Sequence, residues 1–177
     1  MKNLLALSLV ACSTFVMAQQ PEVINKEKMK VLDAWTGHWL GESEAMNAEG
    51  QMMKASVDER IESKLDGTIL LVEGIGTITK PGAEKFVVHH ALGIISFDQR
   101  TNEYKFKTYL ANGRSGDAWF KIISDNKYQW GFDAPSFRMR YNITLDPVQK
   151  TWHEVGESSA DGTTWKKTIE MNLKRAE

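Results

Sequence analysis

The chain has 177 residues and a formal net charge of −1, a length that suits one domain with a sizeable core. This near-neutral balance excludes the strongly basic surface that nucleic-acid binding requires, and it gives no polybasic segment for an anionic membrane. Six Trp, seven Phe and four Tyr supply large planar side chains, which fill cores and line apolar ligand pockets alike.

Residues 1–18 have the pattern of a signal peptide. Lys2 is followed by an apolar run over residues 4–16. Ala18 is a small residue of the kind found at signal-peptide cleavage sites, and polar residues follow it. The apolar run is shorter than the roughly 20 residues that span a bilayer. We therefore expect an extracytoplasmic protein, periplasmic in a bacterium or secreted, although a buried N-terminal helix is the alternative interpretation.

The single cysteine, Cys12, lies inside this predicted leader. Cleavage after Ala18 would leave a mature chain without cysteine, and therefore without a disulfide or a thiolate metal site. The run Leu-Val-Ala-Cys that ends at Cys12 also resembles a bacterial lipobox. In that alternative the protein is a lipoprotein anchored through Cys12, and only then do we expect it to associate with a membrane.

A short helix is predicted at residues 26–34, after an unstructured lead-in at residues 19–25. Met29 and Leu32 share one side of this segment, which indicates an apolar helix face. A helix of this length is unstable alone. We therefore expect it to dock against the rest of the domain.

From Thr36 onward the signals are those of strands and turns. Asp66-Gly67 and the Asn-Gly and Asp-Gly pairs at 112–113 and 161–162 are typical hairpin dipeptides. The runs between turn signals predict ten strands. These are residues 37–47, 51–65, 68–79, 86–97, 103–110, 114–123, 127–133, 137–145, 150–159 and 163–174.

Several of these runs alternate between apolar and polar residues. Phe137, Met139 and Tyr141 alternate with Arg138 and Arg140, which indicates one buried and one wet face, as in an antiparallel sheet. Ten sequential hairpins leave two free edges unless the sheet closes. We therefore predict an all-β, ten-stranded antiparallel up-and-down barrel over residues 36–177, with a two-sheet sandwich as the alternative.

Three motifs follow one another in a recognisable order. They are Gly-His-Trp-Leu-Gly at 37–41, Leu-Asp-Gly-Thr at 65–68 and Glu-Gly at 73–74. In this order they resemble bacterial lipocalin-like domains of unknown function, which are related to the calycin superfamily of lipocalins and fatty-acid-binding proteins. The resemblance covers nearly all of the mature chain and implies a lipocalin-like barrel.

The resemblance also implies structural roles. In calycins the Trp of the opening motif packs under a basic residue of the last strand, a cation–π contact that Lys174 or Arg175 could supply here. Glycines on either side of the indole leave room for it. The residues to which we assign structural roles are Gly37, Trp39, Gly41, Asp66 and Gly67.

Nitrobindin-like haem barrels are distant relatives of this architecture and use a His of the last strand as the iron ligand. The predicted last strand, residues 163–174, contains no His, so the resemblance does not supply a haem site here, and no cofactor is identified. His89 and His90 are adjacent and must face opposite sides of a strand. We therefore predict no functional metal site.

A ten-stranded barrel is wider than its own side chains easily fill. We expect part of the aromatic set to line a cavity for a small apolar or amphipathic molecule. Glu73, on an otherwise apolar strand face, is either a polar anchor in that cavity or a residue of the wet outer surface, as we expect for Glu59. The predicted ligand-binding residues are Glu73, His90, Tyr104, Trp130, Phe132, Met139 and Tyr141.

The functional hypothesis is an exported barrel that binds a small, mostly apolar ligand. Three alternatives remain: a barrel enzyme that uses Glu73 and a histidine as acid and base, a haem or metal protein, and an interaction scaffold of the cell envelope. The sequence has no Gly-x-Ser-x-Gly, no phosphate loop and no dinucleotide fingerprint. We therefore predict no catalytic residue and regard an enzyme as the less favoured class.

Overall fold

The structure, a computed structural model, describes residues 21–47, 49–79, 82 and 84–176. The expected signal peptide, residues 1–18, and the lipobox at Cys12 lie outside these residues. No helix in this described part of the chain is both long and apolar enough to cross a membrane.

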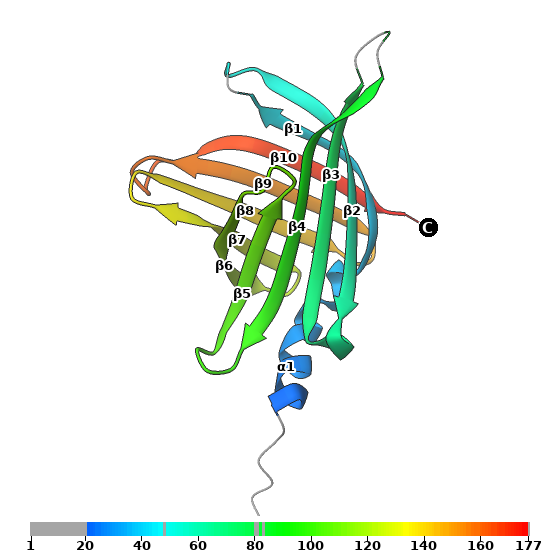
Figure 1. The fold of residues 1–177 in the computed structure, drawn as a ribbon, viewed down its shortest axis with the longest axis vertical. Coiled ribbons are helices and arrows are strands. Elements are labelled where there is room, and N and C mark those ends of the chain that lie inside the picture. Colours follow the sequence, from blue (N-terminus) through cyan, green and yellow to red (C-terminus); the bar gives the residue numbers. More distant parts are fainter. Residues whose placement is uncertain (1–20, 48, 80–81, 83, 177) are drawn as a thin grey trace, which may run out of the picture.

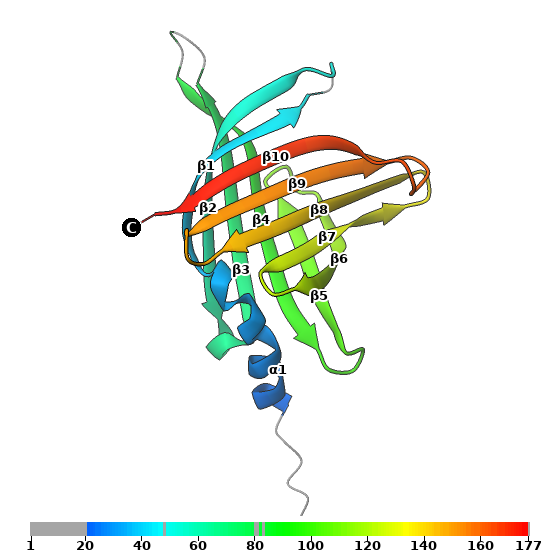
Figure 2. The ribbon, with the colours of Figure 1, turned by 180° about the vertical axis from the view of Figure 1, so that it is seen from behind.

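Ten strands form one closed antiparallel barrel (Figures 1 and 2). Each strand pairs with its neighbour in the chain, and β1 pairs with both β2 and β10, which closes the sheet. The predicted barrel is therefore confirmed and the sandwich alternative is wrong. The strands are β1 (Gly37–Met46), β2 (Met52–Lys64), β3 (Ile69–Thr79), β4 (Lys85–Asp98), β5 (Glu103–Leu110), β6 (Ser115–Ser124), β7 (Lys127–Ala134), β8 (Phe137–Asp146), β9 (Thr151–Ser159) and β10 (Lys166–Arg175).

The start of the last strand differs from the prediction. β10 begins at Lys166, whereas the sequence pattern placed the start at residue 163. The reason is a side-chain cap: Asp161 Oδ1 accepts hydrogen bonds from the backbone N–H groups of Thr163 (2.8 Å) and Thr164 (2.7 Å). These bonds hold the two residues in the turn and keep them out of the ladder.

The N-terminal helix is longer than predicted. α1 (Pro21–Met29) continues as a 3-10 helix, η1 (Lys30–Trp35), so the predicted unstructured lead-in was wrong from Pro21 onward. Proline suits the first helical position because its missing N–H has no partner there in any helix, and Glu22 in the first turn complements the helix dipole.

The helix caps one end of the barrel, as Figures 1 and 2 show. The Tyr104 hydroxyl donates to the Lys28 carbonyl (2.6 Å), and the Tyr128 hydroxyl donates to the Val31 carbonyl (2.9 Å). Lys26 pairs with Asp66, which lies with Gly67 in the tight turn η2 (Leu65–Gly67). Both turn residues have positive φ, 59° and 91°, which suits the predicted Asp-Gly turn signal.

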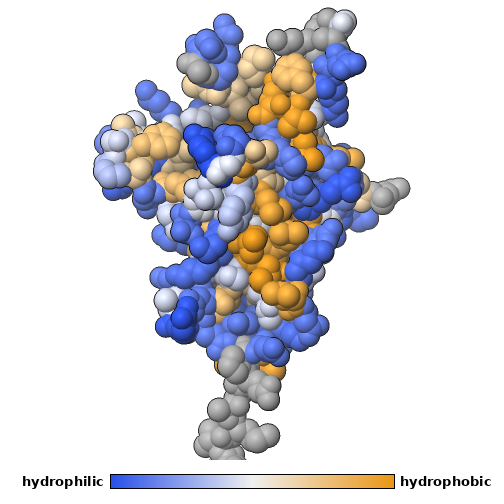
Figure 3. All heavy atoms as spheres, viewed as in Figure 1, coloured by the Kyte–Doolittle hydropathy of each residue, from blue (hydrophilic) through white to orange (hydrophobic). Residues whose placement is uncertain are grey.

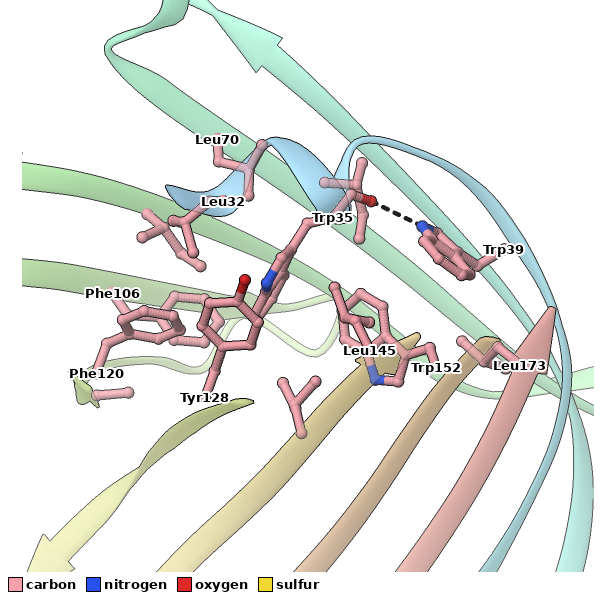
Figure 4. Packing of buried hydrophobic residues seen from close by; sticks show 14 of the residues in the cluster. Leu32, Trp35, Trp39, Leu70, Phe106, Phe120, Tyr128, Leu145, Trp152 and Leu173 are labelled. Carbon is pink, nitrogen blue, oxygen red and sulfur yellow. Dashed lines mark hydrogen bonds between the residues drawn. The ribbon is translucent and has the colours of Figure 1, made fainter. Parts of the chain in front are cut away.

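An aromatic cluster joins the helix to the barrel wall (Figure 4). Trp35 lies edge-on to Trp152 and Tyr128, with ring centroids 4.7 Å and 5.1 Å away. Trp39 Nε1 donates to the Trp35 carbonyl at 2.7 Å, and Trp39 and Trp35 are each only 1% exposed. Burial of these rings contributes several kcal/mol in total, at about 25 cal/mol per Å² of apolar surface.

Arg175 completes this end of the barrel. Its guanidinium lies over the Trp39 ring, 4.7 Å from the centroid, and Nη2 donates to the Ala34 carbonyl at 2.7 Å. Arg175, rather than Lys174, therefore makes the predicted cation–π contact. Gly37, beside Arg175, has a φ of 140°, a backbone conformation that favours glycine.

We expect Arg175→Ala to lower the free energy of unfolding by about 1–3 kcal/mol, because it removes a cation–π contact and a charge-assisted hydrogen bond together. Urea unfolding followed by tryptophan fluorescence measures this loss. Lys174→Ala is the matched control, because Lys174 is adjacent to Arg175 in the sequence and is exposed. Its replacement should change the free energy of unfolding by no more than about 0.5 kcal/mol. Equal effects of the two variants would contradict the assigned role of Arg175.

Candidate functional site

The barrel interior becomes more exposed with distance from the helix. Trp152, Leu145 and Tyr128, close to the helix, are buried, whereas Phe137, at the far end of its strand, is 46% exposed. Residues between these limits, such as Trp130, are partly exposed. Solvent therefore reaches the interior from the end opposite the helix, and that part of the interior is the candidate site.

Four of the predicted ligand-binding residues lie together there. Trp130 and Tyr141 stack, with ring centroids 4.0 Å apart and planes within 10°, and Phe132 lies edge-on to Trp130 at 5.8 Å. The Tyr141 hydroxyl is 3.8 Å from Met139 Sδ. Gly156 on the neighbouring strand makes room for this group, because a Cβ there would lie 2.8 Å from the Tyr141 ring.

Glu154 is a buried carboxyl beside these rings and was not predicted as a site residue. Its oxygens accept hydrogen bonds from Trp130 Nε1 (3.2 Å) and Trp152 Nε1 (3.1 Å). Burial raises its pKa to about 7, although the two indole N–H groups favour the ionised form. The alternation of Trp152, Glu154 and Gly156 along β9 is the sequence signal that could have placed it inside.

Glu59 is a second interior carboxyl, and the expectation that it faces outside water was wrong. It pairs in register with the buried Trp39 and with Gly74, and a Cβ at Gly74 would lie 2.4 Å from its Oε1. Glu59 therefore lies over a glycine on the inner face, because it alternates with Val57 and Ile61, both buried.

The environment of Glu59 is apolar but accessible. Burial raises the pKa of its carboxyl to about 8, and the nearby charges of Glu154 and then Asp58 raise it further. No hydrogen bond reaches this carboxyl from any residue that the structure describes. The residue is nevertheless partly exposed, so solvent reaches it although protein atoms surround the carboxyl.

Glu73 and His90 come together, but on the outer face of the barrel. Their side chains are 2.8 Å apart and 43% and 41% exposed. Gly74 and Ala91, the residues next to them, pair on the inner face, so strand alternation turns Glu73 and His90 outward. This placement differs from the interior anchor that the sequence suggested.

The outer surface around this pair is unusually apolar. Figure 3 shows hydrophobic residues gathered over β3 and β4. The outward-facing residues of the two strands that contribute are Ile69, Leu71, Ile75, Leu92 and Ile94. Apolar residues on both faces of β3 explain why the sequence pattern did not show on which side Glu73 lies.

The structure also shows the orientations of Tyr104 and of the adjacent pair His89 and His90. Tyr104 faces inward but lies at the helix end, where its hydroxyl binds Lys28, so it is remote from the accessible part of the interior. His89 and His90 face opposite sides, as predicted. His89 lies inward near the open end, opposite Gly76, where partial burial and then the neighbouring His90 lower its pKa.

The last-strand His that a resemblance to nitrobindin-like barrels would imply is absent from β10. His153 on β9 faces outward, where its Nε2 lies 3.1 Å from Glu170. Among the described residues, no three His, Cys, Asp or Glu side chains lie close enough together to hold a metal ion. The residues present therefore do not fit a haem site transferred to the last strand.

Comparison with solved structures supports the fold. The S-type phycobiliprotein lyase CPES from Guillardia theta superposes with a TM-score of 0.55 over 90% of this chain and 99% of that chain, at 12% sequence identity. At this identity the likeness shows the fold alone, a closed antiparallel barrel. No protein-family model matches the sequence, and no curated protein matches it.

The interior carboxyls give the stability of the barrel a specific pH dependence. Their raised pKa values mean that the folded state prefers them protonated, so this contribution is complete below about pH 4.5, the unfolded value, and is lost as the pH rises toward 7 for Glu154 and 8 for Glu59. Each carboxyl changes the free energy of unfolding by at most about 1.4 kcal/mol per pH unit.

We therefore expect Glu59→Gln to match the wild type at pH 5 and to exceed it by about 1–3 kcal/mol at pH 8.5, because the variant has no interior charge to desolvate. Urea unfolding at both pH values measures this difference. Glu62→Gln, on the same strand but exposed and paired with Lys64, is the control and should show no such gain. If the difference in the free energy of unfolding between Glu59→Gln and the wild type does not increase with pH, the interior placement of Glu59 is contradicted.

Proposed function

We propose that the protein binds a small, mostly apolar or amphipathic molecule inside its barrel. The observation that carries this proposal is Glu59, a carboxyl that protein atoms surround, that solvent reaches and that has no hydrogen-bond partner among the described residues. A partly exposed carboxyl in apolar surroundings with no protein partner depends on water for its hydrogen bonds. A ligand group that reaches this carboxyl would supply these hydrogen bonds.

The aromatic group supports the same proposal. Trp130, Phe132 and Tyr141 present a partly exposed apolar wall to the interior, and apolar lining with a few polar groups is typical of small-molecule sites. The solved neighbour is named a phycobiliprotein lyase. At this low identity the likeness concerns the fold, and the chemistry of the site must be argued from this chain.

We also propose that residues 1–18 export the protein and that it belongs with the bacterial lipocalin-like domains that its motifs resemble. The intact mass of protein from an export-competent host tests the export step. A chain that begins at Gln19 supports a free extracytoplasmic protein, a lipidated chain that begins at Cys12 supports the anchored alternative, and a chain that retains Met1 contradicts both.

The ligand itself is tested by native mass spectrometry. We expect the protein purified from its own host to carry an extra mass that is lost on denaturation, and a visible absorption band would identify a pigment. Trp130→Ala should reduce the bound fraction at least tenfold. Trp119→Ala is the matched control, because Trp119 packs on the outside against Gly131 and its loss should leave the bound mass in place.

A bare polypeptide mass at all protein concentrations would contradict the binding function. It would favour an envelope interaction scaffold, a second candidate that the apolar outer face over β3 and β4 supports. The enzyme alternative is less favoured, because Glu73 and His90 contact each other on the outer surface, away from the enclosed interior.

A further inference from the structure

We propose that the barrel interior selects an organic cation, a protonated amine or heterocycle on an apolar body, which is held between Glu59 and Glu154. This inference rests on the proposed binding function and names its ligand class. It is carried by the arrangement of the two carboxyls and of the groups that face them.

The two carboxyls flank the same pair of rings. Glu59 pairs in register with Trp39, which lies edge-on to Trp152 with ring centroids 5.7 Å apart, and Trp152 Nε1 donates to Glu154. The charge of Glu154 raises the pKa of Glu59, and no ion pair within the described residues reaches either carboxyl. Glu154 is held by two neutral donors, the indoles of Trp130 and Trp152, and Glu59 has no hydrogen bond within the described residues. An indole N–H orients a carboxylate without neutralising its charge. The site therefore has excess acceptor capacity and a deficit of positive charge.

The other charged side chains of the interior do not fill this deficit. Among the inward-facing strand residues that the structure describes, His89, Lys166 and Arg175 could carry positive charge. Lys166 lies at the start of β10 and is exposed toward the open end. Arg175 is committed to Trp39 and the Ala34 carbonyl at the helix end. Burial lowers the pKa of His89, which favours its neutral form.

A ligand ammonium group would supply both the hydrogen-bond donors and the positive charge that the site lacks. It brings up to three N–H donors and one positive charge, and hydrogen bonds between ions are about twice as strong as neutral ones. Opposite charges also attract more strongly in an interior of low dielectric than in water. The stacked rings of Trp130 and Tyr141 can contact the apolar body or the cation itself, whereas an anionic ligand would meet two carboxyls and be repelled.

Binding of a cation must be linked to proton release. Burial raises the pKa of Glu59 most, and the charges of Glu154 from β9 and of Asp58 on its own strand raise it further. Burial and then the charge of Glu154 also raise the pKa of Tyr141 on β8. Near neutral pH the Glu59 carboxyl holds a proton, which passes to the solvent when a cation binds beside it. Affinity for a cation therefore rises with pH, by up to tenfold per unit between pH 6 and 8.

The test uses three probes with one apolar body: 2-naphthylmethylamine, 2-naphthylmethanol and 2-naphthoate. Calorimetric titration of the full protein at pH 7.5 should show that the amine binds at least tenfold more tightly than the alcohol, and that naphthoate binds most weakly. Glu59→Gln should lower the amine-to-alcohol ratio to the smaller value that Glu154 alone supports. Glu62→Gln, on the outer side of the same strand, should retain the full ratio.

A second measurement needs no variant. Titration of the amine into the wild-type protein at pH 7 in two buffers of different ionisation enthalpy should show the release of close to one proton per amine bound, and no release with the alcohol. Equal binding of amine and alcohol, or a preference that Glu59→Gln leaves undiminished, would overturn the cation proposal. A retained native ligand would still support the binding function in that case. If none of the three probes binds, the cation proposal also fails.

Discussion

The structure depends on the closure of the sheet by β1, which pairs with β2 on one side and with β10 on the other. Closure brings Trp39 of the first strand under Arg175 of the last, and the helix that precedes β1 is drawn across the barrel end with Trp35 inside. Residues 35–39 and Arg175, far apart in sequence, thus form one unit. An open sheet would leave two unpaired edges and an unburied helix.

Glycines determine the shape of the interior above this unit. Gly74 lies under the Glu59 carboxyl, Gly93 under Phe106 and Gly156 under Tyr141, and a Cβ at any of the three would lie within 2.8 Å of the side chain above it. A large group on one strand therefore lies flat over a glycine on a neighbouring strand. This pairing lets two carboxyls and several rings occupy the interior without filling it.

The interior combines features that oppose stability with features that suit binding. Two carboxyls in apolar surroundings make the folded state costlier as they ionise, which is the usual sign of a group retained for chemistry or recognition. The helix end holds the densely packed aromatic cluster, and the carboxyls lie where packing is looser. The carboxyls thus adjoin the packed end of the barrel through Trp39 and Trp152, at the point where the accessible interior begins.

Much of this was predictable from the sequence. Turn dipeptides and alternation located ten strands. The resemblance of the Trp motif to calycins implied a contact of Trp39 with Lys174 or Arg175, and the structure shows that it is Arg175. Local pattern also selected Trp130, Phe132, Met139 and Tyr141, because these lie on strands with one clearly polar face. What only the tertiary structure decided is the side on which each glutamate lies. β3 is apolar on both faces, so its alternation has no direction, and pairing with β2 and β4 alone turns Glu73 outward and leaves Gly74 beneath Glu59.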